Sequence, residues 1–264
     1  MGALVAVERA DDPRLAAFRL NERGLASRAA RRDDTGAGLF LAEGDLVVER
    51  ALDAGCEPYA ALADGERLPE VASRIADRGV DVYVGGDDVR RMVTGLGMPH
   101  PIVALFHRPP RPAAADLIAR SERLVVVEGV DNPANVGAIV RNAGGLGWDG
   151  LLLDHTSADP LSRRSLRVAM GTAFSLPHAR SAALAADLSS ADGIELLALT
   201  PDPAATDIRS IRPCGRRAVL IGSERAGLSA ELLARSRPVR IPMAGGVDSL
   251  NAAAAAAIAC FALA

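Results

Sequence analysis

Five apolar segments in the second half of the chain constrain its fold more than any other feature. Each lacks the strict alternation of apolar and polar side chains that marks a strand with one solvated face. Strands that are apolar on both faces are typical of a parallel sheet covered by helices on both sides. The segments are LVVVEGV (124–130), GLLLDH (150–155), IELLALT (194–200), AVLIGSE (218–224) and VRIPM (239–243). Helix-like stretches separate them, so the sequence predicts an α/β domain over residues 116–264.

The first part of the chain alternates shorter helix-like and strand-like patterns. We expect helices over 12–28 and 45–55, and strands over 39–44, 80–86 and 101–107. These elements predict a small α/β domain over residues 1–106. The following RPPRPAAA has the proline density of a linker, which we place at 107–115.

Composition narrows the class of protein. The chain is 49% hydrophobic and 24% charged, which suits a packed globular protein, while only 3% aromatic residues leave few rings for base stacking. The formal charge of −3 argues against a protein that coats nucleic acid. Residues 1–106 hold 13 Arg against 18 Asp and Glu (−5), and the rest holds 17 against 15 (+2). Any contact with a polyanion must therefore be local.

Cysteine spacing and the chain start indicate the compartment. Cys56, Cys214 and Cys260 are far apart and show no metal-type pairing, so we expect reduced thiols and no metal. The first residues lack the pattern of a secretory signal, and the alanine-rich end is too short to span a bilayer. We expect a cytoplasmic protein without a membrane anchor.

Three segments carry polar residues suited to chemistry, and the first is residues 124–147. A buried strand runs into an Asn-Pro turn and a helix, with Pro133 at a first-turn position. Asn135 and Arg141 lie six residues, or nearly two helical turns, apart and could border one cleft. The helix N-terminus favours an anion. The alternative is that Asn132 is a simple N-cap and Arg141 a solvated charge.

The second segment, residues 218–229, reads AVLIGSERAGLS. Gly222 ends a strand, where a missing side chain would let a ligand approach the backbone closely. Glu224 then lies at the carboxyl end of that strand, where ligands of open α/β sheets bind. The alternative is that Glu224 caps the next helix.

The third segment, residues 239–264, places a glycine-containing loop between a short strand and an alanine-rich helix. Ser249, Leu250 and Asn251 open that helix, and Ser249 alone could be its N-cap. Alanine at consecutive positions allows another backbone to pack very close, which suits a crowded or subunit interface.

In this order, the three segments resemble the motifs of the SpoU (TrmH) branch of the SPOUT methyltransferases. The matching patterns are N-x-x-x-x-x-R, I-G-S-E-x-x-G, and I-P-M-x-G followed by S-L-N. The stretch DPLSRRSLRVAMGTAFSLPH (159–178) resembles the family's basic region with its methionine-glycine turn. FLAEGDLVVERALDAG (40–55) resembles the small ribosomal-protein-like RNA-binding domain that often precedes the catalytic domain.

The resemblance implies a trefoil-knotted α/β domain that binds S-adenosylmethionine in the knot. Gly222, Ile241 and Leu250 would hold the cofactor mainly through main-chain groups, and Thr200, Met243 and Ala244 would line its pocket. Arg141 matches the family's catalytic arginine. A guanidinium is an improbable base, so Arg141 would hold a phosphate beside the target ribose and stabilise the developing alkoxide.

The resemblance also gives roles to the other polar residues. Asn135, Ser249 and Asn251 would orient the ribose and the arginine, and Glu224 would hold the third motif in place. Arg163, Arg164 and Arg167 would contact RNA phosphates, with a solvated helix face as the alternative.

The expected reaction is methyl transfer to a ribose 2′-hydroxyl of RNA by a homodimer that packs through its knotted domains. Ribosomal RNA is favoured over transfer RNA because of the ribosomal-protein-like domain. A base methyltransferase with a carboxylate that deprotonates a ring nitrogen is one alternative. A non-catalytic RNA-binding protein is another.

Overall fold

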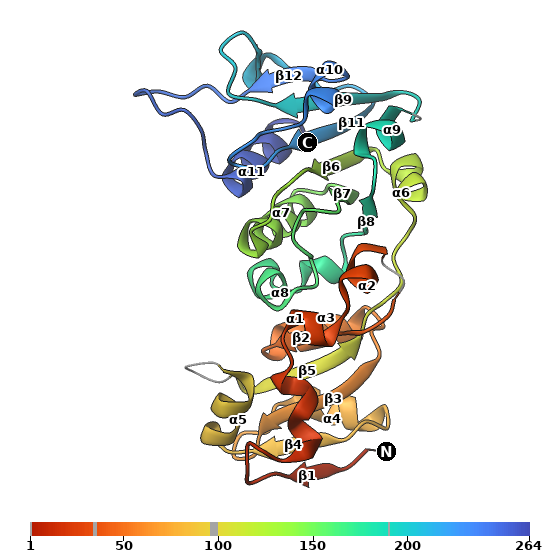
Figure 1. Cartoon of the computed structure of the whole chain (residues 1–264), viewed down its shortest axis with the longest axis vertical. Coiled ribbons are helices and arrows are strands. Elements are labelled where there is room, and N and C mark those ends of the chain that lie inside the picture. The colour runs from red at the N-terminus through yellow and green to blue at the C-terminus, as the bar shows by residue number, and fades with distance from the viewer. Residues whose placement is uncertain (1, 34–35, 96–99, 190) are drawn as a thin grey trace. The chain divides into compact units, whose positions relative to one another are not determined.

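The computed structural model describes residues 2–33, 36–95, 100–189 and 191–264 (Figure 1). The chain divides into two compact units. Unit 1 comprises Met1–Pro110 and Leu161–Phe174, and unit 2 comprises Arg111–Pro160 and Ser175–Ala264. A packed unit need not fold independently, so the predicted domain boundaries stay a prediction.

Unit 2 is built on a parallel sheet of seven strands, which confirms the predicted α/β class. Its order is β10-β12-β9-β11-β6-β7-β8. The strands are β6 (Arg123–Val127), β7 (Gly150–Asp154), β8 (His178–Ser181), β9 (Ile194–Leu199), β10 (Thr206–Asp207), β11 (Arg216–Ile221) and β12 (Arg237–Arg240). All five predicted strands are present. The short edge strands β8 and β10 escaped sequence reasoning because neither contains an apolar run.

Helices cover both faces of this sheet, as unalternated strands require (Figure 1). They are α6 (Ala114–Arg120), α7 (Pro133–Gly145), α9 (Leu184–Ser189), α10 (Ala230–Ala234) and α11 (Ala252–Ala262), with the 3₁₀ turn η3 (Ile208–Ser210). α11 packs on α7, and the Trp148 indole N–H donates to the Cys260 carbonyl at 3.0 Å. Ala256 and Ala259 are fully buried, so the alanine-rich helix does pack closely. Threading of this segment through a knot stays a prediction.

Unit 1 contains a mixed sheet in the order β1-β4-β3-β5-β2. Its strands are β1 (Leu4–Ala6), β2 (Leu39–Glu43), β3 (Pro58–Asp64), β4 (Val82–Gly85) and β5 (Ile102–His107). β1, β4 and β3 run parallel, and β5 is antiparallel to both β3 and β2. The helical elements are η1 (Pro13–Arg19), α1 (Glu22–Leu25), α2 (Arg28–Asp33), α3 (Asp45–Asp53), α4 (Glu70–Asp77), α5 (Asp87–Thr94), α8 (Arg163–Ala169) and η2 (Thr172–Phe174).

One sequence expectation for unit 1 was wrong, and one strand was missed. The single helix expected over 12–28 is broken, because the Asn21 side chain accepts hydrogen bonds from the N–H groups of Arg23 and Gly24 and starts a new helix there. β3 was missed because its alanines favour helices in isolation, whereas pairing with β4 and β5 on both sides makes it a central strand.

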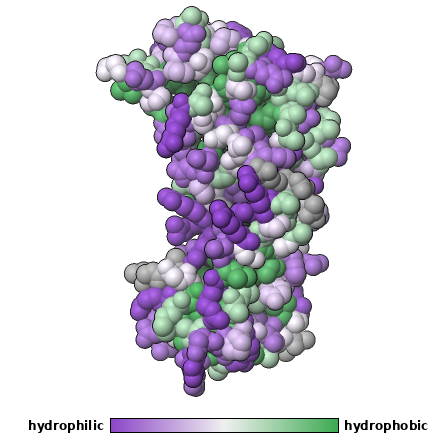
Figure 2. Space-filling model, in the orientation of Figure 1, coloured by the Kyte–Doolittle hydropathy of each residue, from purple (hydrophilic) through white to green (hydrophobic). Residues whose placement is uncertain are grey.

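The described residues carry neither a membrane-spanning helix nor a metal-type cluster. No helix among them is long and apolar enough to cross a bilayer. Among the same residues, no group of three or more His, Cys, Asp or Glu side chains could hold a metal ion. Hydrophilic side chains dominate the face of the molecule shown in Figure 2, with smaller apolar areas between them.

Candidate functional site

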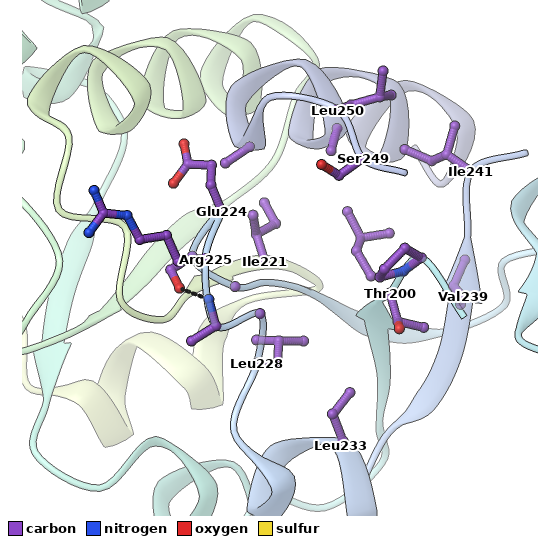
Figure 3. A pocket seen from close by; sticks show the side chains of 18 of the residues that line it. Thr200, Ile221, Glu224, Arg225, Leu228, Leu233, Val239, Ile241, Ser249 and Leu250 are labelled. Carbon is purple, nitrogen blue, oxygen red and sulfur yellow. Dashed lines mark hydrogen bonds between the residues drawn. The ribbon is translucent and has the colours of Figure 1, made fainter. Parts of the chain in front are cut away.

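A cavity of about 360 Å³ opens at the carboxyl ends of β9, β11 and β12 in unit 2 (Figure 3). Its size lies in the range of small-molecule sites, and its place is where open α/β sheets bind ligands. The walls are formed mostly by apolar side chains, among them Leu199, Ile221, Leu228, Leu233 and Val239. The loop before α11 and the first turn of α11 close the remaining side.

Most of the residues predicted for the cofactor gather at this cavity. Its lining includes Thr200, Gly222, Ile241, Met243 and Leu250, but not Ala244. Ser249 and Glu224 also line it. The two backbone segments therefore meet as their motifs predicted, although 19 positions separate Gly222 from Ile241 in the sequence.

Gly222 is required by the fold of its own loop. A Cβ atom there would lie 2.2 Å from the carbonyl carbon of Gly227 and 2.4 Å from the nitrogen of Leu228. The loop folds back because the Gly227 N–H donates to the Ser223 carbonyl at 3.0 Å. The close approach at Gly222 is made by the chain itself, so the approach of a ligand to this backbone stays a prediction. Residues 222–227 of this turn all line the cavity.

Three side chains join the three motif segments in one hydrogen-bonded chain, which we call the amide relay: Asn251, Asn135 and Glu224. The Asn135 amide N–H donates to the Glu224 carboxylate, and the Asn135 oxygen accepts from the Asn251 amide at 3.0 Å. Asn135 is only 8% exposed. In Figure 3 the Glu224 carboxylate points away from the cavity, consistent with this contact.

Side-chain hydrogen bonds at the helix starts decide the capping alternatives. Asn251, not Ser249, caps α11, since its side-chain oxygen accepts from the N–H groups of Ala253 and Ala254 at 2.9 and 3.3 Å. Glu224 does not cap the next helix, because Ser229 is the N-cap of α10. Asn132 does cap α7, where it accepts from the Ala134 N–H at 3.0 Å. Ser249 thereby keeps its hydroxyl at the cavity.

Asp154, at the end of β7, is a supporting residue that sequence reasoning missed. Its carboxylate accepts from the N–H groups of Gly129 and Ser157 at 3.0 and 2.9 Å and from the Thr156 hydroxyl. Burial raises the pKa of Asp154, but these hydrogen bonds outweigh burial and leave the pKa below its usual range. The bond to Gly129 fixes the turn before α7. An Asp at the end of a strand, with Thr and Ser two and three residues later, is the local signal of such a turn.

Arg141 has surroundings opposite to those of Asn135 on the same helix. It is exposed, does not line the cavity, and forms no hydrogen bond or ion pair with the residues that the structure describes. Six residues turn a helix by about 600°, which is about 120° short of two full turns. The two side chains therefore leave α7 in different directions. Neither Asn135 nor Arg141 is among the residues that line the cavity, so the expectation that both border one cleft fails for this cavity within one subunit.

The three predicted RNA-binding arginines lie on α8 in unit 1. Arg163 pairs with the Glu43 carboxylate and donates to the Thr94 carbonyl at 2.9 Å. Arg164 and Arg167 are exposed. The set is thus not uniform: Arg163 is hydrogen-bonded to the buried Glu43, Arg167 lies 4.0 Å from the other oxygen of Glu43 but is itself exposed, and Arg164 faces solvent.

Comparison with known proteins now decides the family. The profile described as the SpoU rRNA Methylase family matches residues 122–261, more than half of the chain, and this range contains all three motifs. The chain belongs to the SpoU rRNA methylase family.

Individual SpoU relatives match nearly the whole chain. An uncharacterized tRNA/rRNA methyltransferase of Mycobacterium tuberculosis is 40% identical over 94% of this chain and 88% of its own. The 23S rRNA (guanosine(2553)-2′-O)-methyltransferase RlmP of Bacillus subtilis is 28% identical over 86% and 89%. The crystal structure of an AdoMet-bound rRNA methyltransferase from Sinorhizobium meliloti superposes with a TM-score of 0.82 at 28% identity, over 98% and 97% of the two chains.

Proposed function

We propose that this SpoU protein transfers the methyl group of S-adenosylmethionine to a ribose 2′-hydroxyl of ribosomal RNA. The amide relay is the observation that carries the proposal. It joins Asn135 of the first motif, Glu224 of the second and Asn251 of the third, and Glu224 also lines the cavity. Relatives named as rRNA and 23S rRNA 2′-O-methyltransferases support the choice of substrate.

The cavity fits the proposed cofactor. Apolar walls from Ile221, Leu228 and Val239 suit a nucleoside ring, and the exposed main chain after Gly222 offers hydrogen-bonding groups. Ile241 and Leu250 would hold the cofactor from the opposite wall. When bound, S-adenosylmethionine supplies an activated methyl group on a sulfonium centre.

Arg141 and Ser249 are the groups free to handle the ribose. The Ser249 hydroxyl lines the cavity and can donate to or accept from a sugar oxygen. Arg141, which carries no ion pair with described residues, can bind the neighbouring phosphate and stabilise charge on the attacking oxygen. Asn135 has already committed one N–H and one lone pair to the relay, so we assign it to positioning first.

The same proposal includes a homodimer, which the family resemblance implies. α11 exposes Ile258 at 39% and Phe261 at 75%, and large exposed apolar side chains on one helix indicate a contact surface. A two-fold contact through this helix would bury the same patch on both subunits. Phe261→Glu should then yield monomers in light scattering, whereas a variant that stays dimeric contradicts this choice of surface.

The test of the reaction is a map of ribose methylation in ribosomal RNA from cells with and without the gene. We expect one position to lose its resistance to alkaline cleavage when the gene is absent, because a 2′-O-methyl group blocks that cleavage. A methylated product that remains cleavable at the modified nucleotide would favour the base methyltransferase. A folded protein that binds no S-adenosylmethionine in calorimetry would remove the enzyme and leave the non-catalytic RNA-binding alternative.

A further inference from the structure

Unit 1 contains a buried carboxylate whose partner lies 120 residues away in the sequence. The Glu43 side chain, at the end of β2, is 1% exposed and pairs with the Arg163 guanidinium. Arg167 brings a second guanidinium to 4.0 Å from the other Glu43 oxygen. A buried carboxylate without a partner is strongly destabilising, so Glu43 requires α8 to lie where it does.

Both ends of α8 are fastened by further contacts within unit 1. At its start, the Arg163 N–H donates to the Glu22 carboxylate at 2.7 Å. At its end, the Arg50 guanidinium donates to the Met170 carbonyl at 2.5 Å. Met170 is the left-handed C-cap of α8, with φ of 53°. The helix is therefore held at its first residue, at its cap and along one face.

This arrangement changes the charge of unit 1 locally. Residues 1–106 carry a net −5, but the segment Leu161–Phe174 adds three arginines and no acid. Arg163 and one buried carboxylate neutralise each other. Three exposed arginines remain around α8, namely Arg50, Arg164 and Arg167. We call them the α8 arginine surface.

We propose that the α8 arginine surface binds phosphates of the RNA backbone and that Glu43 and Arg163 are positioning residues for it. The choice of RNA as ligand rests on the proposed function. Arginine is suited to this role because its planar fork matches phosphate oxygens. Arg164 and Arg167 are three residues apart on α8 and so project side by side. The mainly acidic unit thus acquires its phosphate-binding charge from a segment that lies within the range of the family match.

Binding of the full-length protein to a fluorescein-labelled hairpin of ribosomal sequence, measured by anisotropy over a series of salt concentrations, tests the proposal. Each lost phosphate contact should lower the slope of log affinity against log salt by about 0.7 to 0.9. For Arg164→Ala/Arg167→Ala we therefore expect a slope smaller by about 1.5 and roughly tenfold weaker binding at low salt. The control Arg9→Ala/Arg74→Ala removes the same charge from exposed, ion-paired arginines of unit 1 and should leave the slope unchanged.

Glu43→Gln tests the positioning role. Removing a negative charge beside arginines should by itself strengthen binding to a polyanion, whereas loss of positioning should weaken it and lower the salt slope. We expect weaker binding. Stronger binding, or an unchanged slope with only a lower melting temperature, would reduce Glu43 to a structural residue and overturn that part of the proposal.

The affinity for S-adenosylmethionine separates this proposal from the proposed function. All three variants should keep the cofactor affinity of the parent, because none touches the cavity of unit 2. If the parent protein binds no cofactor, the proposed reaction is contradicted. The α8 arginine surface is still tested in that case, because the salt dependence of RNA binding does not require the cofactor. Equal slopes for Arg164→Ala/Arg167→Ala and the parent would overturn the surface.

Discussion

Helix α7 carries two of the predicted catalytic side chains, and the structure gives them opposite surroundings. Asn135 is buried and hydrogen-bonded to both neighbouring motifs. Arg141 is exposed and makes no such contact with described residues. Both belong to one sequence motif, yet one is held in place and the other is available.

The difference indicates how work is divided at the site. A side chain whose polar atoms are hydrogen-bonded inside the protein is already ordered before a ligand binds. It can therefore keep the loops of the site in place without a further loss of entropy on binding. A guanidinium in solvent can exchange water for a phosphate without first breaking an internal ion pair. We therefore expect Asn135 to position the motif loops and Arg141 to contact RNA.

Arg141→Ala should produce the largest effect. Loss of a group that stabilises developing charge lowers kcat about 100- to 1000-fold. Since Arg141 is exposed, the free energy of unfolding should change by less than about 0.5 kcal/mol and cofactor affinity should persist. Single-turnover methylation, calorimetry and thermal unfolding measure the three quantities, with the exposed Arg120→Ala on α6 as the control. Activity that survives would remove Arg141 from the chemistry and with it the contrast on α7.

Gly222→Ala tests whether the cavity wall depends on the folded-back loop. The added methyl group overlaps Gly227 and Leu228, so we expect a loss of about 1–3 kcal/mol in stability and at least tenfold weaker cofactor binding. Gly145→Ala is the matched control, because nothing lies within 4 Å of a Cβ at that helical position. Unchanged calorimetry for Gly222→Ala would mean that the cofactor does not use this loop.

The sequence was sufficient to predict which segments meet. Apolar runs such as 124–130 indicate a parallel sheet, and such a sheet places the residues after each strand at one edge, so Gly222 and Ile241 could be expected together. It could not predict which side chains bond. Ser249 and Asn251 both precede α11 and both residue types cap helices. The choice of Asn251 follows from a tertiary contact with Asn135 that leaves no local trace.

Long-range pairing explains the other failures as well. The assignment of α8 to unit 1 depends on Glu43 and Arg163, and no local pattern links residues 120 positions apart. The net −5 of residues 1–106 likewise omits the three arginines that the segment Leu161–Phe174 adds to unit 1. The charge counted along the sequence therefore differs from the charge of the packed unit.

Asn251→Asp should break the relay while it preserves the helix cap. Aspartate caps helices as well as asparagine does, but its carboxylate cannot donate to the Asn135 oxygen. Rotating the Asn135 amide so that it donates to the new carboxylate would instead turn its oxygen toward Glu224. One hydrogen bond to the buried Asn135 is lost in either case, so we expect about tenfold lower kcat and a loss of about 1–3 kcal/mol in stability.

Asn132→Asp is the control for this variant. Asn132 caps α7 in the same way but takes no part in the relay, so its activity should match the parent. Equal kcat values for Asn251→Asp and Asn132→Asp would show that Asn251 acts only as a cap. Asn135 would then be buried without a positioning role, which contradicts the division of roles between Asn135 and Arg141.

His178, in β8, is as buried as Asn135, but unlike Asn135 it has a ring nitrogen without a hydrogen-bond partner among the described residues. Its Nδ1 lies 3.0 Å from the Leu176 carbonyl, while its buried Nε2 has no hydrogen-bond partner among the described residues. Burial, together with the charge of Arg111, lowers the pKa of His178 to about 3. The folded protein therefore keeps this imidazole neutral at pH values where the unfolded chain, with a pKa of about 6.5, binds a proton.

The sign of the pH effect follows from that difference. Above about pH 6.5 neither state is protonated at His178 and the residue adds no pH dependence. Between about pH 6.5 and 3 the unfolded state binds one more proton, so stability falls by up to about 1.4 kcal/mol per pH unit as the pH is lowered. His178→Phe should remove this part of the slope in urea unfolding at pH 5 and 7, while methylation at pH 7 changes little. An identical slope in the variant would show that His178 binds a proton equally well in the folded and unfolded states. Its Nε2 would then have a hydrogen-bonding partner in the folded protein, as the amide of Asn135 does.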